Sequence, residues 1–144
     1  MNGTTINTFD DLIHQINQTA GDVQRERGTL FEKLVLAYLK NEPTYQRLYK
    51  NVWELSDVPA EYGIPKKDTG VDLVAEQFNG DLVAIQAKFY ENKVGKSEIN
   101  SFVAELGKSY YQRGLIVSTV DDWNKNAQDT IEHNEKGIEL IGLS

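Results

Sequence analysis

Three polar side chains interrupt a stretch of the sequence that is otherwise apolar. The stretch is DTGVDLVAEQFNGDLVAIQAKFY, residues 68–90, and the three residues are Asp72, Gln86 and Lys88. Two apolar runs on either side of an Asn-Gly pair are typical of antiparallel strands joined by a tight turn. A carboxylate, an amide oxygen and an ammonium held together on such strands would form a hard-oxygen site beside a cation, which suits Mg²⁺.

Whether these side chains meet depends on the register of the hairpin. A two-residue type I′ loop would point Asp72 away from Gln86 and Lys88. A three-residue loop over residues 78–80, with Gly80 in a left-handed bulge, places Asp72 opposite Gln86. We favour the second register because it makes one face wholly apolar. That face would carry Val71, Leu73, Ala75, Val83, Ile85, Ala87 and Phe89.

A divalent ion at this site would position and acidify a water molecule and would stabilise the charge that develops in phosphoryl transfer. The main-chain carbonyl of Ala87, between the glutamine and the lysine, would add a further ligand. Lys88 would orient the attacking water or offset the growing negative charge.

Glu32 is a further candidate on a separate argument. It lies at helical spacing from Val35, Leu36 and Leu39, and so shares their apolar stripe. A buried carboxylate needs a partner, which a metal ion or Lys88 would supply. The alternative is an acid that is simply well placed near the N-terminus of its helix.

The elements that must position these residues follow the order helix, three strands, helix, strand, helix, strand. Helices are expected near residues 8–19, 29–41, 45–49, 97–106 and 121–131, and strands near 51–57, 71–77, 81–90, 114–120 and 137–143. The closing strand-helix-strand unit implies parallel neighbours, whereas the hairpin is antiparallel. We therefore expect an α/β fold with a mixed sheet and helices on both of its faces.

The composition indicates one globular domain. The chain has 144 residues, of which 40% are hydrophobic and 26% charged. Because it has no cysteine, a metal ion would have to be held by oxygen or nitrogen. No apolar run is long enough for a membrane span, and the first residues do not resemble a signal peptide, so we expect a cytoplasmic protein.

The net charge of -7 argues against DNA binding over the whole surface. The acid excess lies mainly in residues 114–144, which carry six acidic and two basic side chains. The middle of the chain is nearly balanced, and its lysines form either a basic rim around the three polar residues or ordinary solvated loop charges. These lysines are Lys66, Lys67, Lys88, Lys93 and Lys96.

The run GVDLVA, a turn and IQAKFY resemble the PD-(D/E)XK nuclease superfamily in its Mrr-like form, where glutamine replaces the second acid. RGTLFEKLVLAYL resembles the first core helix with its metal-side glutamate, VGKSEINSF the helix after the Q-x-K strand, and GLIVSTVDDWNKNAQDTIE the later strand and helix. The resemblance implies a restriction-endonuclease-like fold, with residues 27–144 as the nuclease core and residues 1–26 as an N-terminal helical extension.

The resemblance implies Mg²⁺-dependent hydrolysis of DNA phosphodiester bonds, with Mn²⁺ as a substitute. Asp72, Gln86 and the Ala87 carbonyl would be metal ligands, Lys88 the catalytic lysine and Glu32 an accessory ligand. Asp68 matches a position that is often acidic or glycine in relatives and ranks second. Because an amide binds a divalent ion less tightly than a carboxylate, occupancy without DNA would be low.

The chain also resembles the N-terminal nuclease part of single-polypeptide, ATP-dependent restriction enzymes. This implies double-stranded DNA as partner, and a fragment of a longer protein with a linked helicase, translocase or methyltransferase domain. No GxxxxGK[ST] loop is present, so the chain does not itself bind ATP in that way. The alternative is a catalytically degenerate nuclease fold that serves as a docking or DNA-binding module.

Overall fold

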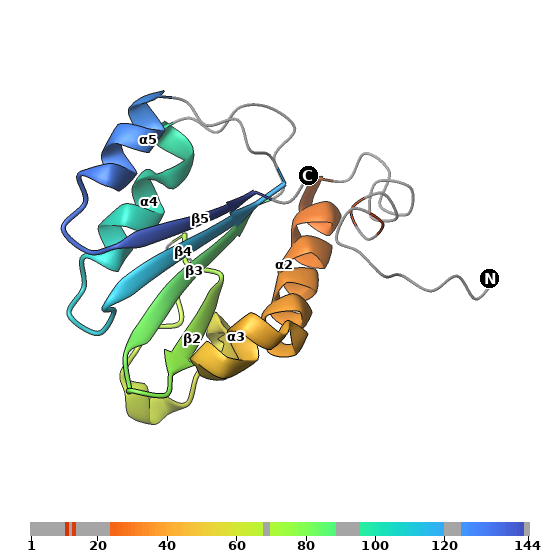
Figure 1. The fold of residues 1–144 in the computed structure, drawn as a ribbon. Helices are drawn as coiled ribbons and strands as arrows, with labels where there is room; N and C mark the ends of the chain where they lie inside the picture. Colours follow the sequence, from red (N-terminus) through yellow and green to blue (C-terminus); the bar gives the residue numbers. More distant parts are fainter. Residues whose placement is uncertain are drawn as a thin grey trace.

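The computed structural model describes residues 11, 13, 24–67, 70–88, 96–119 and 125–142 (Figure 1). At residues 24, 25 and 96–98 only the backbone is described. These parts of the chain form one five-stranded sheet with helices on both faces, as the sequence predicts. None of the described helices has the length and apolar character needed to cross a membrane.

The strands follow each other across the sheet in chain order, from β1 to β5. The pairs β1–β2 and β2–β3 are antiparallel, and the pairs β3–β4 and β4–β5 are parallel, so the predicted mixed sheet is confirmed. The strands are β1 (Tyr49–Glu54), β2 (Leu73–Gln77), β3 (Leu82–Lys88), β4 (Arg113–Ser118) and β5 (Ile138–Gly142). The helices are α2 (Gln24–Asn41), α3 (Pro43–Leu48), α4 (Lys96–Leu106) and α5 (Lys125–Glu132), with 3-10 turns η1 (Leu55–Asp57) and η2 (Ala60–Tyr62).

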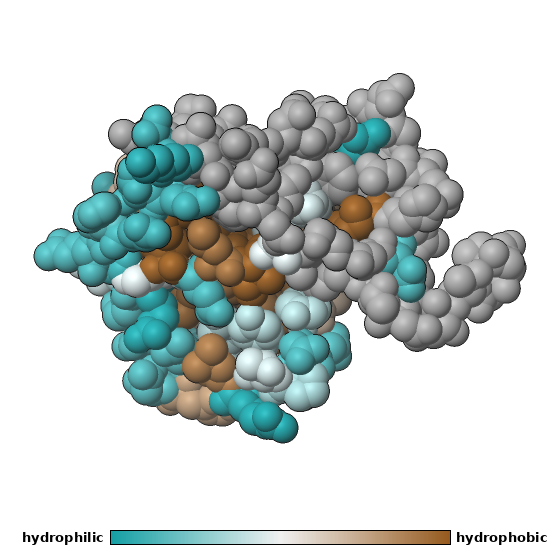
Figure 2. Space-filling view, turned by 45° about the horizontal axis from the view of Figure 1, so that its top comes forward, coloured by the Kyte–Doolittle hydropathy of each residue, from teal (hydrophilic) through white to brown (hydrophobic). Residues whose placement is uncertain are grey.

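Each face of the sheet has its own apolar cluster. Helix α2 covers one face through Phe31, Val35 and Leu39, which recur every four residues and are fully buried. Helices α4 and α5 cover the other face, with Phe102 and Ile131 among their buried residues. Burying one such side chain contributes roughly 1.5–3 kcal/mol, so both layers hold the strands firmly. In Figure 2, apolar residues gather near the middle of the view, beside hydrophilic residues on the α4–α5 side.

The β2–β3 hairpin has the three-residue loop that the apolar pattern favours. Leu73 pairs with Ile85, and at the loop the N–H of Gln77 donates to the carbonyl of Asp81 at 2.9 Å. Gly80 has a φ of 94°, in the left-handed region that glycine adopts without a steric cost. The bulged loop is therefore confirmed, and so is the predicted register from Leu73 to Glu76; the expected pair of Asp72 with Gln86 is not part of the regular ladder, because Asp72 bonds to Ile85.

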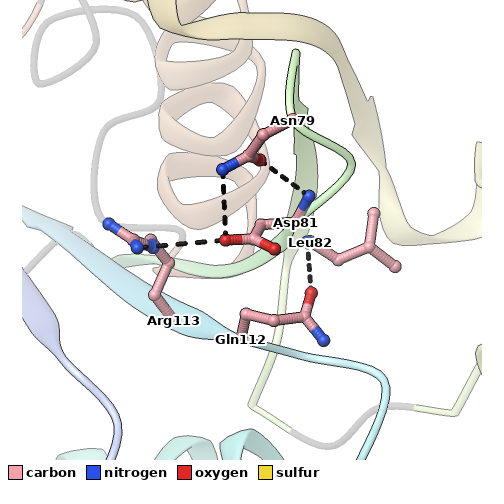
Figure 3. A network of polar contacts seen from close by, with 5 residues as sticks. All are labelled: Asn79, Asp81, Leu82, Gln112 and Arg113. Carbon is pink, nitrogen blue, oxygen red and sulfur yellow. Dashed lines mark hydrogen bonds and ion pairs between the residues drawn. The ribbon is translucent and has the colours of Figure 1, made fainter.

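Side chains in the loop and next to it connect the hairpin to the start of β4 (Figure 3). Oδ1 of Asn79 accepts a hydrogen bond from the N–H of Asp81 at 3.0 Å, and Nδ2 of Asn79 donates to the carboxylate of Asp81 at 3.4 Å. That carboxylate also lies 3.9 Å from the guanidinium of Arg113. The N–H of Leu82 donates to Oε1 of Gln112 at 2.6 Å. These contacts fix the loop end of the hairpin against β4 and so help to keep β2 and β3 in register.

One residue on the predicted apolar face was assigned wrongly. Val71 packs in the cluster under α4 and α5, whereas Leu73 packs under α2. The N–H of Asp72 donates to the carbonyl of Ile85 at 2.8 Å, although Ile85 is the pairing partner of Leu73. This irregular pairing breaks the strict alternation of side chains just before β2. Phe89 lies outside the described residues.

Several element boundaries differ from the predicted ones. Helix α2 begins at Gln24, earlier than the expected residue 29. Strand β1 ends at Glu54 because the next three residues form a 3-10 turn. Of the first predicted helix, the structure describes only residues 11 and 13, both helical.

Lys136 fastens the segment before β5 to the end of α4. Its ammonium donates to the carbonyls of Leu106, Lys108 and Tyr111 at 2.8, 2.7 and 2.6 Å. Carbonyls at the end of a helix have no partner within the helix, so an external donor is needed there. A charged donor makes a stronger hydrogen bond than a neutral one. Lys136 therefore couples the last helix-to-strand connection to the α4 layer.

We predict that Lys136→Met lowers the free energy of unfolding by about 2 kcal/mol, because three carbonyls lose their donor while the aliphatic stem remains. Urea unfolding followed by circular dichroism measures the change. Lys125→Met is the matched control, since Lys125 is exposed at the start of α5, and its effect should stay within about 0.5 kcal/mol. Equal effects of the two substitutions would contradict the role of Lys136.

Candidate active site

Asp72 is hydrogen-bonded on three sides. Its N–H donates to the carbonyl of Ile85 at 2.8 Å, and its own carbonyl accepts from the N–H of Leu55 at 3.1 Å. Its carboxylate Oδ2 accepts from the N–H of Ala87 at 2.9 Å. Ala87 is the middle residue of the Q-x-K run, so the acid is held directly against that run.

A cleft of about 330 Å³ opens beside Asp72. Glu32, which is half-buried on α2, lines the same cleft, so the structure brings together the two carboxylates that the sequence singled out. The other described residues that line it are Glu54, Leu55, Ser56, Lys66, Lys67 and Val71. The cleft is therefore built by α2, the end of β1 and the segment that leads into β2.

Gln86 lies on the α4 side of this arrangement. It is 1% exposed, and its Nε2 donates to the carbonyl of Gly70 at 3.3 Å. Gly70 in turn lies against α4, because a Cβ at this position would come within 2.8 Å of the backbone nitrogen of Phe102. Gln86 is not among the described residues that line the cleft of Asp72. The two residues are linked through the Asp72–Ala87 hydrogen bond instead.

The lysines singled out by the sequence have different environments. Lys88 is exposed at the end of β3, where it pairs with Ser118 of β4. Lys66 lines the cleft, but its ammonium donates to the carbonyls of Leu55, at 3.0 Å, and Val58. Lys66 therefore holds the turn after β1 in place, a structural contact that the sequence did not predict.

Three other candidates cannot be placed. Asp68, Lys93 and the side chain of Lys96 lie outside the described residues. Lys67 is exposed and lines the cleft.

Glu54 is a cleft residue that sequence reasoning missed. It pairs with Leu73, the residue after Asp72, and its carboxylate lies 4.0 Å from Nζ of Lys33 on α2. A single acidic residue at the end of a strand is common, so the sequence around Glu54 does not mark it as a site residue. Only the pairing of β1 with β2 brings it beside Asp72, and the apolar pattern of the β2–β3 hairpin does not specify that pairing.

The donor set fits a hard divalent ion. Asp72 and Glu32 offer carboxylate oxygens in one cleft whose described lining has no imidazole, and such oxygens suit Mg²⁺ or Mn²⁺. Within the described ranges, no group of three or more His, Cys, Asp or Glu side chains is arranged to hold a metal ion, and Glu54 faces Lys33. Amide, main-chain or water oxygens would have to complete the coordination, as Mg²⁺ sites commonly allow.

The chain matches a known protein family, but it matches no curated protein sequence. The Mrr-type catalytic family, described as restriction endonuclease, matches residues 40–144.

The solved structures that match this chain include two restriction enzymes. The chain is 75% identical to part of the ATP-dependent Type ISP restriction-modification enzyme LlaBIII bound to DNA, with a TM-score of 0.81. The match covers 96% of this chain and 8% of that enzyme. The MspJI restriction endonuclease in complex with a 27-mer oligonucleotide is 17% identical, with a TM-score of 0.57, over 99% of this chain and 33% of that one. The similarity to MspJI shows only that the two folds are alike.

Gly70→Ala should lower the free energy of unfolding by roughly 2 kcal/mol or more, because φ at Gly70 is 88° and the new Cβ would meet the backbone of α4. Gly28→Ala is the matched control inside α2, where nothing lies within 4 Å, and it should stabilise by about 0.5–1 kcal/mol. Urea unfolding of both variants tests this. Effects of the same sign would show that the contact of Gly70 with α4 is not tight.

Proposed function

This chain belongs to the restriction endonuclease family, and we propose that it hydrolyses DNA phosphodiester bonds at the cleft beside Asp72. One observation supports this assignment above the others: the Asp72 carboxylate is fixed on the N–H of Ala87, within the Q-x-K run, and shares its cleft with Glu32. Restriction endonucleases generally depend on a metal ion. We propose that here the ion is Mg²⁺, with Mn²⁺ able to replace it.

Asp72 and Glu32 are the proposed carboxylate ligands, and Gln86 and the carbonyl of Ala87 the proposed neutral ones. When bound, the ion would supply an activated water and stabilise charge on the phosphoryl group. The hydrogen bonds of Asp72 to β3 and to η1 hold its backbone and its carboxylate in one orientation, which would avoid reorganisation during the reaction. Asp68 remains a second-rank candidate.

Lys88 is the proposed catalytic lysine. It stands at the exposed end of β3, one residue after the N–H that holds Asp72. From there its ammonium would approach the phosphate and offset the negative charge that grows on the phosphate oxygens. A charged lysine is sufficient for this role, so no proton has to leave its ammonium.

The second candidate function is a degenerate nuclease fold that binds DNA without cutting it. The position of Gln86 favours this reading, because the residue is 1% exposed and the described lining of the Asp72 cleft does not include it. In this case Gln86 would serve to hold Gly70 rather than an ion.

Double-stranded DNA is the proposed substrate, and the candidate contacts to its backbone are Lys66, Lys67, Lys93 and Lys96. The chain spans 8% of the length of LlaBIII, so we propose that it works inside a longer cytoplasmic protein with a helicase, translocase or methyltransferase part. In that protein, residues 27–144 would be the nuclease core and residues 1–26 a helical extension.

Asp72→Asn and Lys88→Ala should each lower the rate of DNA cleavage in Mg²⁺ at least about 100-fold, because each removes a charge needed in the transition state. Asparagine can still accept the N–H of Ala87 through its amide oxygen, so Asp72→Asn should fold normally. Nicking of supercoiled plasmid in Mg²⁺, in Mn²⁺ and in EDTA measures the effect.

Lys108→Ala is the control, because Lys108 is exposed after α4 and outside the described lining of the cleft. It should cleave at the wild-type rate. If the wild-type chain and both site variants nick DNA equally, the proposed site is wrong. If the wild-type chain binds DNA but never cuts it in either metal, the degenerate reading is correct.

A further inference from the structure

Charge is distributed unevenly between the two edges of the sheet. At the β5 edge, α5, β5 and the segment between them carry four exposed acids (Asp129, Glu132, Glu135 and Glu139) and one exposed base, Lys125. At the β1 edge, the described side chains of α2, α3 and β1 include four exposed bases (Lys33, Lys40, Arg47 and Lys50) and one exposed acid, Glu26. The fold thus separates charges that the net value of -7 conceals.

A groove of about 470 Å³ lies along the β1 edge, between the end of α2 and the edge strand. None of its described lining residues is acidic, although the chain as a whole is acidic. Its polar and aromatic lining comprises Lys40, Gln46, Tyr49, Lys50, Asn51, Trp53 and Phe78. Phe78, at the tip of the β2–β3 hairpin, is 64% exposed and marks the far end of the groove.

The carboxylate that faces this edge from β2 is already engaged. Glu76 lies opposite Asn51 in the pairing of β1 and β2. Its Oε1 accepts hydrogen bonds from Nδ2 of Asn51 and from the hydroxyl of Tyr62, both at 2.9 Å. The bond to Glu76 raises the pKa of Tyr62 because it favours the protonated hydroxyl. The two lysines of the groove therefore face no competing acid on its described lining.

The groove runs toward the cleft of Asp72 because the same two elements line both. On α2, Glu32 in the cleft and Lys40 in the groove are eight residues apart, about 12 Å along a helix. On β1, Glu54 and Lys50 are four residues apart, about 13 Å along a strand. Lys33 precedes Lys40 by seven residues and so lies on the same side of α2.

We propose that this groove holds the DNA backbone that leads into the cleft, with Lys40 and Lys50 on the phosphates. The inference rests on the proposed function and adds a binding surface to it. The distance of about 12–13 Å between the groove and the cleft corresponds to about four base-pair steps along the axis of a duplex, at roughly 3.4 Å per step. Lysine ammonium groups bind phosphate as point charges, so the contact is independent of DNA sequence.

This surface also explains how an acidic chain can bind a polyanion. Electrostatic steering depends on local potential more than on net charge. The acids of the β5 edge would repel DNA, and the bases of the β1 edge would attract it. The duplex would therefore approach with the β1 edge and the cleft facing it.

The test is the salt dependence of DNA binding by the full 144-residue chain, measured by fluorescence anisotropy with a labelled 20-base-pair duplex in EDTA. The double variant Lys40→Gln/Lys50→Gln should bind about 10-fold more weakly at moderate salt, and its log–log salt slope should fall by about two, one for each lysine lost. The matched control is Lys108→Gln/Lys125→Gln, two exposed lysines on the α4–α5 side, which should keep the wild-type slope.

The outcomes separate this inference from the proposed function. If the groove variant binds with the wild-type slope while Asp72→Asn abolishes cleavage, the groove is wrong and the nuclease stands. If the groove variant loses affinity but the wild-type chain never cleaves, the groove stands and the proposed hydrolysis is wrong. Unchanged DNA binding with altered self-association in sedimentation velocity would assign the groove to a protein contact and overturn the proposal.

Discussion

The position of the Asp72 carboxylate is set by the N–H of Ala87 at 2.9 Å, and much of the fold serves to keep that pair in place. A slip of one residue between β2 and β3 would turn the side chains of one strand to the opposite face. Three features prevent it: the left-handed Gly80 in the loop, the polar contacts from the hairpin to β4, and the two different apolar clusters on the faces. The position of the Asp72 carboxylate in the cleft therefore depends on the strand register.

The fold was largely predictable because its strands have a clear apolar pattern. The alternation in β2 and β3 decided the loop length, and strand-helix-strand order decided the direction of β4 and β5. The errors arose where local pattern competes with tertiary contacts. Val71 is on the other face because the N–H of Asp72 bonds to Ile85, which is the pairing partner of Leu73. This irregular pairing interrupts the alternation of side chains, and the apolar pattern alone does not predict it.

The candidate site was predictable only in part. Asp72 and Glu32 share a cleft, and both are identified as site candidates from their residue types and their positions in the apolar pattern. Glu54 and the carbonyl contacts of Lys66 depend on how β1 lies against β2 and on the turn that follows it, which single-strand patterns do not encode. Gln86 shows a different limit: its strand position was predicted, but its hydrogen bond to Gly70 depends on a backbone carbonyl outside the sheet.

Gly70 has a mechanical consequence for the site. Its backbone touches the backbone of α4, where a methyl group would already be too large, and it sits two residues before Asp72. Side chains can change rotamer to absorb a displacement, whereas two backbones in contact cannot. A sideways movement of α4 would therefore also displace the backbone next to Asp72, from the side of the sheet opposite α2.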